Sequence, residues 1–175
     1  LFDEPQNIEA LLGHSEVLVE QEDWHSVVVN SSFVLERHPD HQRARFLHCV
    51  ALFKLKKYEE LLVSAKLMAK AAPESPKALE VLSQAYLETG DNHAALMSGK
   101  RLLEIKPNHL VANQVVACAY FRLGQFEKSI QANEALLKVS PDNIAAFENL
   151  GVALERMCRL DEAIAAFDRV LEARP

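Results

Sequence analysis

The sequence has little of what disulfide-rich, membrane-spanning or nucleic-acid-binding proteins need. Its 175 residues include only three cysteines, Cys49, Cys118 and Cys158, without a CxxC pair, so neither a disulfide framework nor a zinc ribbon is indicated. No apolar run approaches the roughly 20 residues of a membrane-spanning helix. Acidic residues outnumber basic ones and give a formal net charge of −6, whereas phosphate binding needs clustered Lys and Arg. We therefore expect no membrane span and no nucleic-acid partner.

Glycine is also scarce. The five glycines never cluster, so the phosphate-cradling loop of nucleotide-binding enzymes is absent. Leucine, alanine and glutamate are the commonest residues instead, a composition that favours helix. The unpaired cysteines favour a cytoplasmic location. The chain opens with LFDEPQN rather than Met, and a signal peptide removed upstream would instead place the protein in the periplasm.

What the sequence does contain is a regular spacing of prolines. With the spaced proline set at position 32 of each unit, residues 8–175 divide into the repeats 8–41, 42–75, 76–109, 110–143 and 144–175. Residues 1–7 are then the end of an upstream repeat or a linker. Position 3 is alanine in every repeat, position 8 is always small, and position 11 is bulky. Six of the seven prolines keep the interval of 34 residues: Pro5, Pro39, Pro73, Pro107, Pro141 and Pro175.

The apolar spacing predicts two helices in each repeat. Positions 4, 7, 8 and 11 form one helical stripe, and positions 20, 21, 24, 27 and 28 form a second. Gly90 and Gly124, at position 15, mark the turn between them. The spaced proline ends the second helix, and Asp40, Asn108 and Asp142 are predicted to cap the next first helix. A lone hairpin cannot bury both stripes, so the hairpins must stack into an all-α solenoid of ten helices.

This pattern resembles the tetratricopeptide repeat (TPR) family, and the resemblance extends over essentially the whole chain. It implies a right-handed superhelix of antiparallel hairpins whose first helices line a concave groove. It also implies a non-enzymatic scaffold that binds protein segments there. The first two repeats are degenerate, with Arg45 at position 4 and His14 and His48 at position 7. The fifth repeat fits the family pattern best, through Phe147, Leu150, Gly151, Ala163 and Phe167.

No residue pattern indicates catalysis, a cofactor or a metal ion. His14 and His48 share one position in consecutive repeats, and the HPDH turn at 38–41 holds two more histidines. Neither group brings a further ligand of matching spacing, so we predict no zinc site. Acidic pairs such as Glu59 and Glu60 fall in the first turn of a second helix, where carboxylates favour the helix dipole. We therefore predict that the chain is not an enzyme and needs no cofactor.

The groove prediction rests on positions 2, 5, 9, 12 and 13 of the first helices, which face away from the hairpin. Phe46, Val50 and Phe53 form an apolar line there at i, i+4 and i+7. Exposed bulky apolar groups usually mark a contact site. The alternative is that these side chains fill gaps left by Arg45 and His48. The predicted partner-binding residues are Arg43, Phe46, Val50, Phe53, Lys54, Lys77, Gln84, Leu87, Gln114, Cys118, Phe121 and Arg122.

The charges of that face indicate the kind of partner. Odd repeats contribute mostly acidic groups and even repeats basic ones, which suits a protein or peptide segment that combines apolar anchors with mixed charge. Chaperone-binding TPR domains hold a C-terminal carboxylate with Lys at position 5 and Asn at position 9, and both columns lack these residues here. Two alternatives stay open: the TPR region of a larger transferase, such as a glycosyl- or sulfotransferase, and an envelope scaffold for polysaccharide export.

The two ends of the chain carry a further expectation. Ile164, Phe167 and Leu171 lie on a second helix that no later helix covers, and Leu1 falls at position 28 of an upstream repeat. Terminal repeats need polar outer faces. We therefore expect either additional repeats or a cap in a longer protein, or self-association through the uncapped ends.

Overall fold

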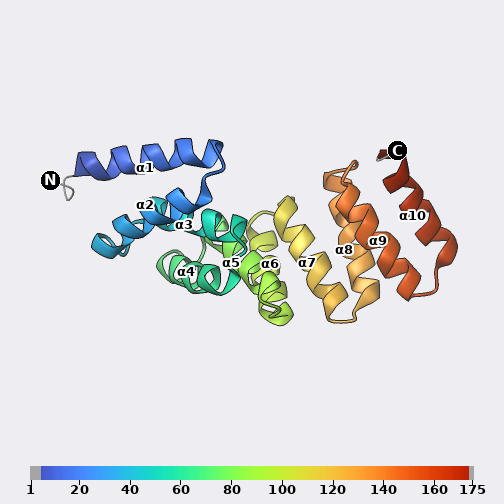
Figure 1. Ribbon diagram of the computed structural model, residues 1–175. Helices are drawn as coiled ribbons and strands as arrows, with labels where there is room; N and C mark the ends of the chain where they lie inside the picture. The colour runs from blue at the N-terminus through green and yellow to red at the C-terminus, as the bar shows by residue number, and fades with distance from the viewer. Residues whose placement is uncertain (1–4, 174–175) are drawn as a thin grey trace. The chain divides into compact units, whose positions relative to one another are not determined.

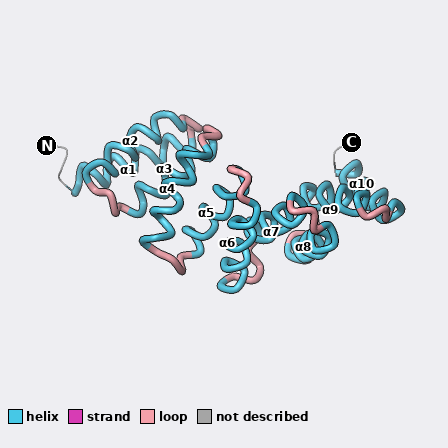
Figure 2. Tube along the Cα trace, turned by 90° about the horizontal axis from the view of Figure 1, so that it is seen from below, coloured by secondary structure: helices cyan, strands magenta, loops and turns pink. Residues whose placement is uncertain are grey.

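The structure, a computed structural model, describes residues 5–173, and these residues form ten helices and no strand (Figure 2). The expected all-α stack of helical hairpins is confirmed. Leu1 and Pro175, to which the repeat pattern assigns positions 28 and 32, lie outside the described residues. The first helices of the repeats are α1 (Pro5–Glu20), α3 (Gln42–Lys54), α5 (Pro76–Glu88), α7 (Leu110–Arg122) and α9 (Ile144–Arg156). The second helices are α2 (Trp24–Arg37), α4 (Tyr58–Ala71), α6 (Asn92–Ile105), α8 (Phe126–Val139) and α10 (Leu160–Ala173) (Figure 1).

The chain forms two compact units, Leu1–Val81 and Leu82–Pro175. The first contains α1 to α4 and the start of α5, and the second contains the rest of α5 and α6 to α10. Neighbouring helices pack side by side within each unit: α1 on α2, α2 on α3 and α3 on α4 in the first, and α6 through α10 in succession in the second. The division into one array of five repeats over 8–175 stays a prediction.

Each hairpin turns through a residue in the left-handed conformation at position 15 of its repeat. At the α3–α4 turn, the Lys56 N–H donates to Phe53 O at 3.0 Å and the Lys57 N–H to Leu52 O at 2.9 Å. This pair of bonds is the Schellman motif, which closes a helix C-terminus when the residue after the cap has positive φ. The φ values are 57° at Glu22 and Lys56, 58° at Cys158, 85° at Gly90 and 71° at Gly124.

The N-caps of three first helices lie one residue later than the sequence suggested, so the prediction of Asp40, Asn108 and Asp142 was wrong. The spaced proline and the residue after it form the centre of a turn. In the turn around Pro39 and Asp40, for example, the His41 N–H donates to His38 O at 3.0 Å. The next residue is therefore the extended one that precedes the helix and caps it. The observed caps are His41 Nδ1, His109 Nδ1 and Asn143 Oδ1, which accept from the backbone N–H of Ala44, Ala112 and Ala146.

The core of each unit forms where a second helix packs between two first helices. Small side chains at positions 3 and 10 of the first helices allow this close approach, and Ala44 and Ala51 are both fully buried. Leu12 occupies position 5 of the first repeat, which the sequence pattern assigned to the groove face, but it is fully buried in the same cluster. That assignment was wrong, since side chains at position 5 can pack between consecutive repeats. The first-unit cluster comprises Ile8, Leu12, Leu18, Val27, Val34, Ala44, Leu47 and Ala51.

Candidate partner-binding site on the first helices

The twelve residues predicted to bind a partner divide equally between the two units. Arg43, Phe46, Val50, Phe53 and Lys54 lie on α3, and Lys77 lies at the start of α5 in the first unit. The other six lie in the second unit, on α5 and α7: Gln84, Leu87, Gln114, Cys118, Phe121 and Arg122.

In the first unit, the apolar line on α3 is present and half-buried. Phe46, Val50 and Phe53 all keep part of their surface exposed. The ring of Phe53 meets the ring of Tyr58 edge to face, with centroids 6.2 Å apart, a geometry that aromatic pairs prefer. The line therefore leaves apolar surface exposed, and the contact with Tyr58 anchors one end of it at the start of α4.

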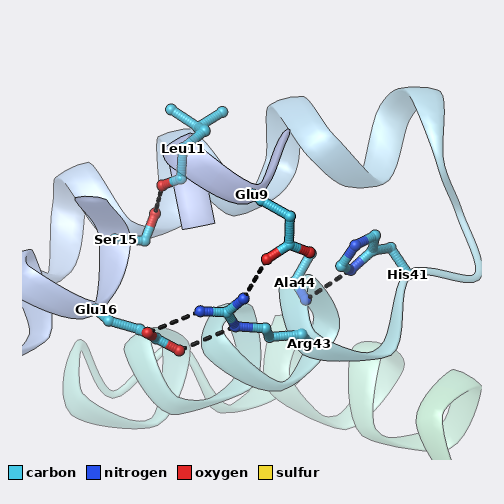
Figure 3. A network of polar contacts seen from close by, with 7 residues as sticks. All are labelled: Glu9, Leu11, Ser15, Glu16, His41, Arg43 and Ala44. Atoms are coloured by element: carbon cyan, nitrogen blue, oxygen red, sulfur yellow. Dashed lines mark hydrogen bonds and ion pairs between the residues drawn. The ribbon is translucent and has the colours of Figure 1, made fainter. Parts of the chain in front are cut away.

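Arg43 links this face to α1, as Figure 3 shows. Its Nε and Nη2 donate to the two carboxylate oxygens of Glu16 at 3.0 and 2.8 Å, and its Nη1 donates to Glu9 at 2.5 Å. The hydrogen bond from Arg43 lowers the pKa of Glu16 below its usual value. Bidentate pairing of this kind fixes geometry as well as charge. The guanidinium is thus already bound by two carboxylates of the same chain.

Two lysines of the predicted site cover aromatic rings. The ammonium nitrogen of Lys77 lies 3.5 Å from the ring centroid of Phe46, and that of Lys54 lies 5.5 Å from the ring centroid of Trp24. A cation over a ring face at these distances is attracted by the ring quadrupole. One face of Phe46 is therefore covered within the chain itself.

The polar residues at inward positions of the second repeat have partners of their own. Arg45 donates to the backbone oxygen of Pro39. The Nδ1 of His48 lies 3.0 Å from the hydroxyl of Ser31 on α2. Burial lowers the pKa of His48 and thereby favours the neutral ring. The degenerate positions are thus occupied by satisfied polar side chains, which weakens the interpretation that the α3 apolar line only fills gaps beside them.

In the second unit, the predicted residues are packed more deeply. Leu87 is 7% exposed and belongs to the cluster with Ala95 and Leu96, so its side chain is part of the core. Phe121 is half-buried against the cluster of Ile130, Ala153 and Leu154, and its ring meets that of Phe126 at a centroid distance of 5.4 Å. Of the six residues, Gln114 and Arg122 are exposed, and Gln84 is half-buried.

Cys118 and Arg122 join the first helices of consecutive repeats in this unit. The Asn149 side-chain nitrogen lies 3.7 Å from the Cys118 sulfur, and Arg122 donates to the backbone oxygen of Leu87. Burial raises the pKa of the Cys118 thiol, which leaves it protonated and unreactive at neutral pH. Both side chains therefore act as links between repeats.

Sequence reasoning missed some of the residues that shape the first-unit face. Trp24 and Tyr58 were never assigned to it, yet each contacts a predicted site residue. Glu9 and Glu16 were placed on the face but not recognised as the partners of Arg43. A signal existed in the sequence: Glu9, Arg43 and Lys77 occupy position 2 of three consecutive repeats.

Two cavities in the first unit were not anticipated. The larger, of about 730 Å³, opens between α1 and α2. A smaller one of about 360 Å³ lies beside the α3–α4 hairpin. The larger cavity is lined by Asn7, Ile8, Ala10, Leu11, His14, Val29, Asn30 and Phe33.

Among residues 5–173, no three His, Cys, Asp or Glu side chains are grouped to hold a metal ion. In the same part of the chain, no helix has the length and hydropathy to cross a membrane.

Comparison with solved structures finds the same fold in MamA. The crystal structure of MamA protein superposes with a TM-score of 0.82 at 19% identity, over 94% of this chain and 90% of that chain. MamA 41-end from Desulfovibrio magneticus RS-1 gives a TM-score of 0.86 at 18% identity, over 94% and 93%. Among curated proteins, no sequence matches this chain.

Two family profiles, both described as tetratricopeptide repeat, match the sequence. One covers residues 117–175 and the other residues 76–109. Together with the helical hairpins and the left-handed residue at position 15 of each repeat, these matches identify the family. The chain belongs to the tetratricopeptide repeat family.

Proposed function

We propose that the protein is a non-catalytic scaffold that binds an extended or helical protein segment across the first-helix face of its first unit. The observation that carries the proposal is the half-exposed line Phe46, Val50 and Phe53 on α3. Protein surfaces that combine bulky apolar groups with a charged border commonly bind other proteins.

The contacts of this face support a partner with apolar anchors more than a charged one. Arg43 is held by Glu9 and Glu16, and the cation of Lys77 lies over Phe46. A highly charged partner would have to replace these internal contacts, whereas an apolar side chain gains from the exposed parts of Val50 and Phe53. Specificity then comes from where the apolar anchors sit, and the charged border sets orientation.

A selected peptide can test this proposal directly. Peptides that bind the 175-residue chain would be isolated from a displayed random library, and their contacts mapped by amide and methyl chemical-shift changes. We expect the largest changes at α3, and at least a tenfold weaker affinity for Phe46→Ala and for Phe53→Ala. Removal of a central aromatic anchor commonly costs about 1–2 kcal/mol or more of binding free energy.

Val63→Ala is the matched control, because Val63 is 63% exposed on α4 and lies outside the proposed face. Its peptide affinity should equal that of the wild type. Chemical-shift changes confined to other helices, or equal losses for Val63→Ala and Phe53→Ala, would exclude the α3 face as the binding site.

Self-association through the chain ends is the second function that we propose. Leu160, Ile164 and Leu171 on α10 are 59%, 58% and 65% exposed. Three large exposed apolar side chains on one helix favour association. Sedimentation velocity at increasing concentration should show a rising weight-average mass, and a constant monomer mass would refute it.

The three cysteines bear on both the cellular location and the question of catalysis. We propose a cytoplasmic location, which the three free thiols support; a signal peptide upstream would make it periplasmic. Burial raises the pKa of the Cys118 and Cys49 thiols, which argues against either of them as a nucleophile. Incubation with a thiol-reactive reporter at neutral pH should label the exposed Cys158 first.

A further inference from the structure

Arg45 on α3 is the one charged residue at position 4 of a repeat, and it is half-buried. Its guanidinium donates to the backbone oxygen of Pro39, a neutral acceptor. Within the described part of the chain, no carboxylate pairs with it. A charge withdrawn from water without an opposite charge costs free energy, so an anion from outside would be stabilised here. The other repeats carry Leu11, Leu79, Asn113 and Phe147 at position 4.

The fourth repeat forms the same link to the preceding turn without a charge. Asn113 on α7 donates its side-chain N–H to the backbone oxygen of Pro107 at 3.4 Å and to that of His109 at 3.1 Å. Position 4 thus ties the start of a first helix to the spaced proline in both repeats, and a neutral amide is sufficient. The positive charge of Arg45 is therefore not needed for this link.

The fifth repeat shows the usual order of apolar and charged groups at positions 4 and 26. Phe147, at position 4, is half-buried, and the guanidinium of Arg169, at position 26, lies 5.6 Å from its ring centroid. In the second repeat the two types are exchanged, because Arg45 is half-buried and Leu67, at position 26, is 48% exposed. An exposed leucine with a half-buried arginine is the reverse of what burial favours.

Arg45 and Leu67 both line the smaller cavity, whose volume of about 360 Å³ is at the lower end of the range of about 300–1,000 Å³ for ligand pockets. Leu67 and Met68 of α4 form an apolar part of its wall. Arg45, Lys70 and Asp40 supply two positive charges and one negative charge, so the lining has an excess of one positive charge. None of the lining residues belongs to the first-helix face proposed above to bind a protein segment.

We propose that this cavity binds an aliphatic carboxylate. Arg45 and Lys70 hold the carboxylate oxygens, and the methylene chain packs on Leu67 and Met68. A guanidinium offers paired N–H donors that match the two oxygens of a carboxylate, and methylene groups gain free energy when they leave water. Two sources have this chemistry: a small carboxylic acid, and a glutamate side chain of a bound protein.

Hexanoate and 1-hexanol are matched probes, because they share an apolar chain and differ in charge. Each would be titrated into the 175-residue chain and followed through the methyl chemical shifts of Leu67 and Met68. We expect saturable changes with hexanoate and about tenfold weaker binding of hexanol, since hydrogen bonds to a charged group are stronger than neutral ones. Equal affinities would overturn the assignment of a carboxylate.

A blocked peptide distinguishes the two sources. N-acetyl-leucyl-glutamyl amide carries a side-chain carboxylate, and N-acetyl-leucyl-glutaminyl amide is its uncharged match. Tighter binding of hexanoate indicates a small acid, and tighter binding of the glutamyl peptide indicates a protein; either supports the site. If neither carboxylate shifts the Leu67 and Met68 methyl signals at millimolar concentration, the site is overturned, while the peptide-binding proposal for the α3 face is unaffected.

Two substitutions test the cations. Arg45→Asn removes the charge and introduces the residue that forms the same link in the fourth repeat. It should weaken hexanoate binding about tenfold and leave hexanol binding unchanged. Lys70→Gln should weaken it less, because Lys70 is exposed in the last turn of α4 and water screens its charge. Lys138→Gln is the matched control, since Lys138 is exposed at the same position 29 on α8, and its affinity should equal that of the wild type.

Asp40→Asn tests the cavity even if Arg45→Asn does not fold, which circular dichroism would show. Asp40 is exposed in the turn before α3, so its substitution should not disturb folding. It is the one carboxylate of the cavity lining, and its removal should tighten hexanoate binding by lessening repulsion between like charges. Wild-type hexanoate affinity in a folded Arg45→Asn, or in both Lys70→Gln and Asp40→Asn, would overturn the proposal.

Discussion

The left-handed residue at position 15 of each repeat gives the sharpest stability prediction. Three of the five repeats place an ordinary L-residue there, at Glu22, Lys56 and Cys158, with φ between 57° and 58°. The left-handed conformation brings Cβ close to the following carbonyl oxygen, at a cost of about 1–2 kcal/mol per residue. Lys56→Gly should therefore stabilise the protein, because glycine has no Cβ and the exposed lysine loses no buried contact.

The expected gain in the free energy of unfolding is the steric cost relieved in the folded state minus the entropy that glycine adds to the unfolded chain. Relief of the steric cost contributes about 1–2 kcal/mol, while the freer unfolded chain takes back about 0.4–1 kcal/mol. The net stabilisation is then about 0.5–1 kcal/mol for each site. The three sites lie in different repeats and should add, giving about 1.5–3 kcal/mol for the triple variant.

Urea unfolding followed by circular dichroism measures this change as a shift of the midpoint. Gly124→Ala is the matched control, because Gly124 occupies the same turn position with φ of 71° and forms the same Schellman bonds. It should lose about as much stability as Lys56→Gly gains. A loss of stability in Lys56→Gly, or a gain in Gly124→Ala, would show that backbone strain at position 15 does not govern these turns.

Two further predictions concern pH and packing. Burial holds the pKa of His48 in the folded protein below its usual value. As pH falls, His48 therefore takes up a proton in the unfolded chain before it does so in the folded protein. The free energy of unfolding should keep its full value above the usual histidine pKa of about 6.5 and fall as pH drops through the lower folded pKa. Urea midpoints between pH 7 and 5 should show this fall, and His48→Gln should reduce it; an unchanged profile would exclude His48 as the source. Gly151→Ala should cost about 1–3 kcal/mol by overpacking, since its methyl group would lie 2.7 Å from the Phe167 ring, whereas Gly13→Ala should gain about 0.5–1 kcal/mol. Thermal melts of the two variants should move in opposite directions, and equal shifts would refute the packing argument.

The helices were predictable because their signals are local. Apolar stripes, the turn at position 15 and the spaced proline all act within one repeat, and the structure places α2, α4, α6, α8 and α10 at the same register in every repeat. The cap prediction failed by one residue for a local reason that composition does not reveal. Asp40 is a good capping residue by type, but it lies inside the turn that His38 and His41 close, and histidine takes the capping place.

The candidate site was less predictable, because its contacts join different repeats. Nothing within α3 alone shows that Arg43 is held by Glu9 and Glu16 on α1, or that Lys77 lies over Phe46. Leu87 occupies a groove-facing position by spacing, yet packing with α6 and α7 buries it. Contacts between repeats depend on the separation of neighbouring helices, which the small residues at positions 3 and 10 set.

The ion pairs on the first-helix face bear on how the proposed partner would be selected. Arg43 and the two carboxylates form an exposed network, and exposed ion pairs contribute little to stability, so its main effect is to fix the position of α1 relative to α3. A partner that approached by charge alone would meet groups already satisfied within the chain. Selection must then depend on the apolar surface of Val50 and Phe53, which no internal contact fully covers. Raised salt should consequently slow association with the partner far less than loss of Phe53 weakens it.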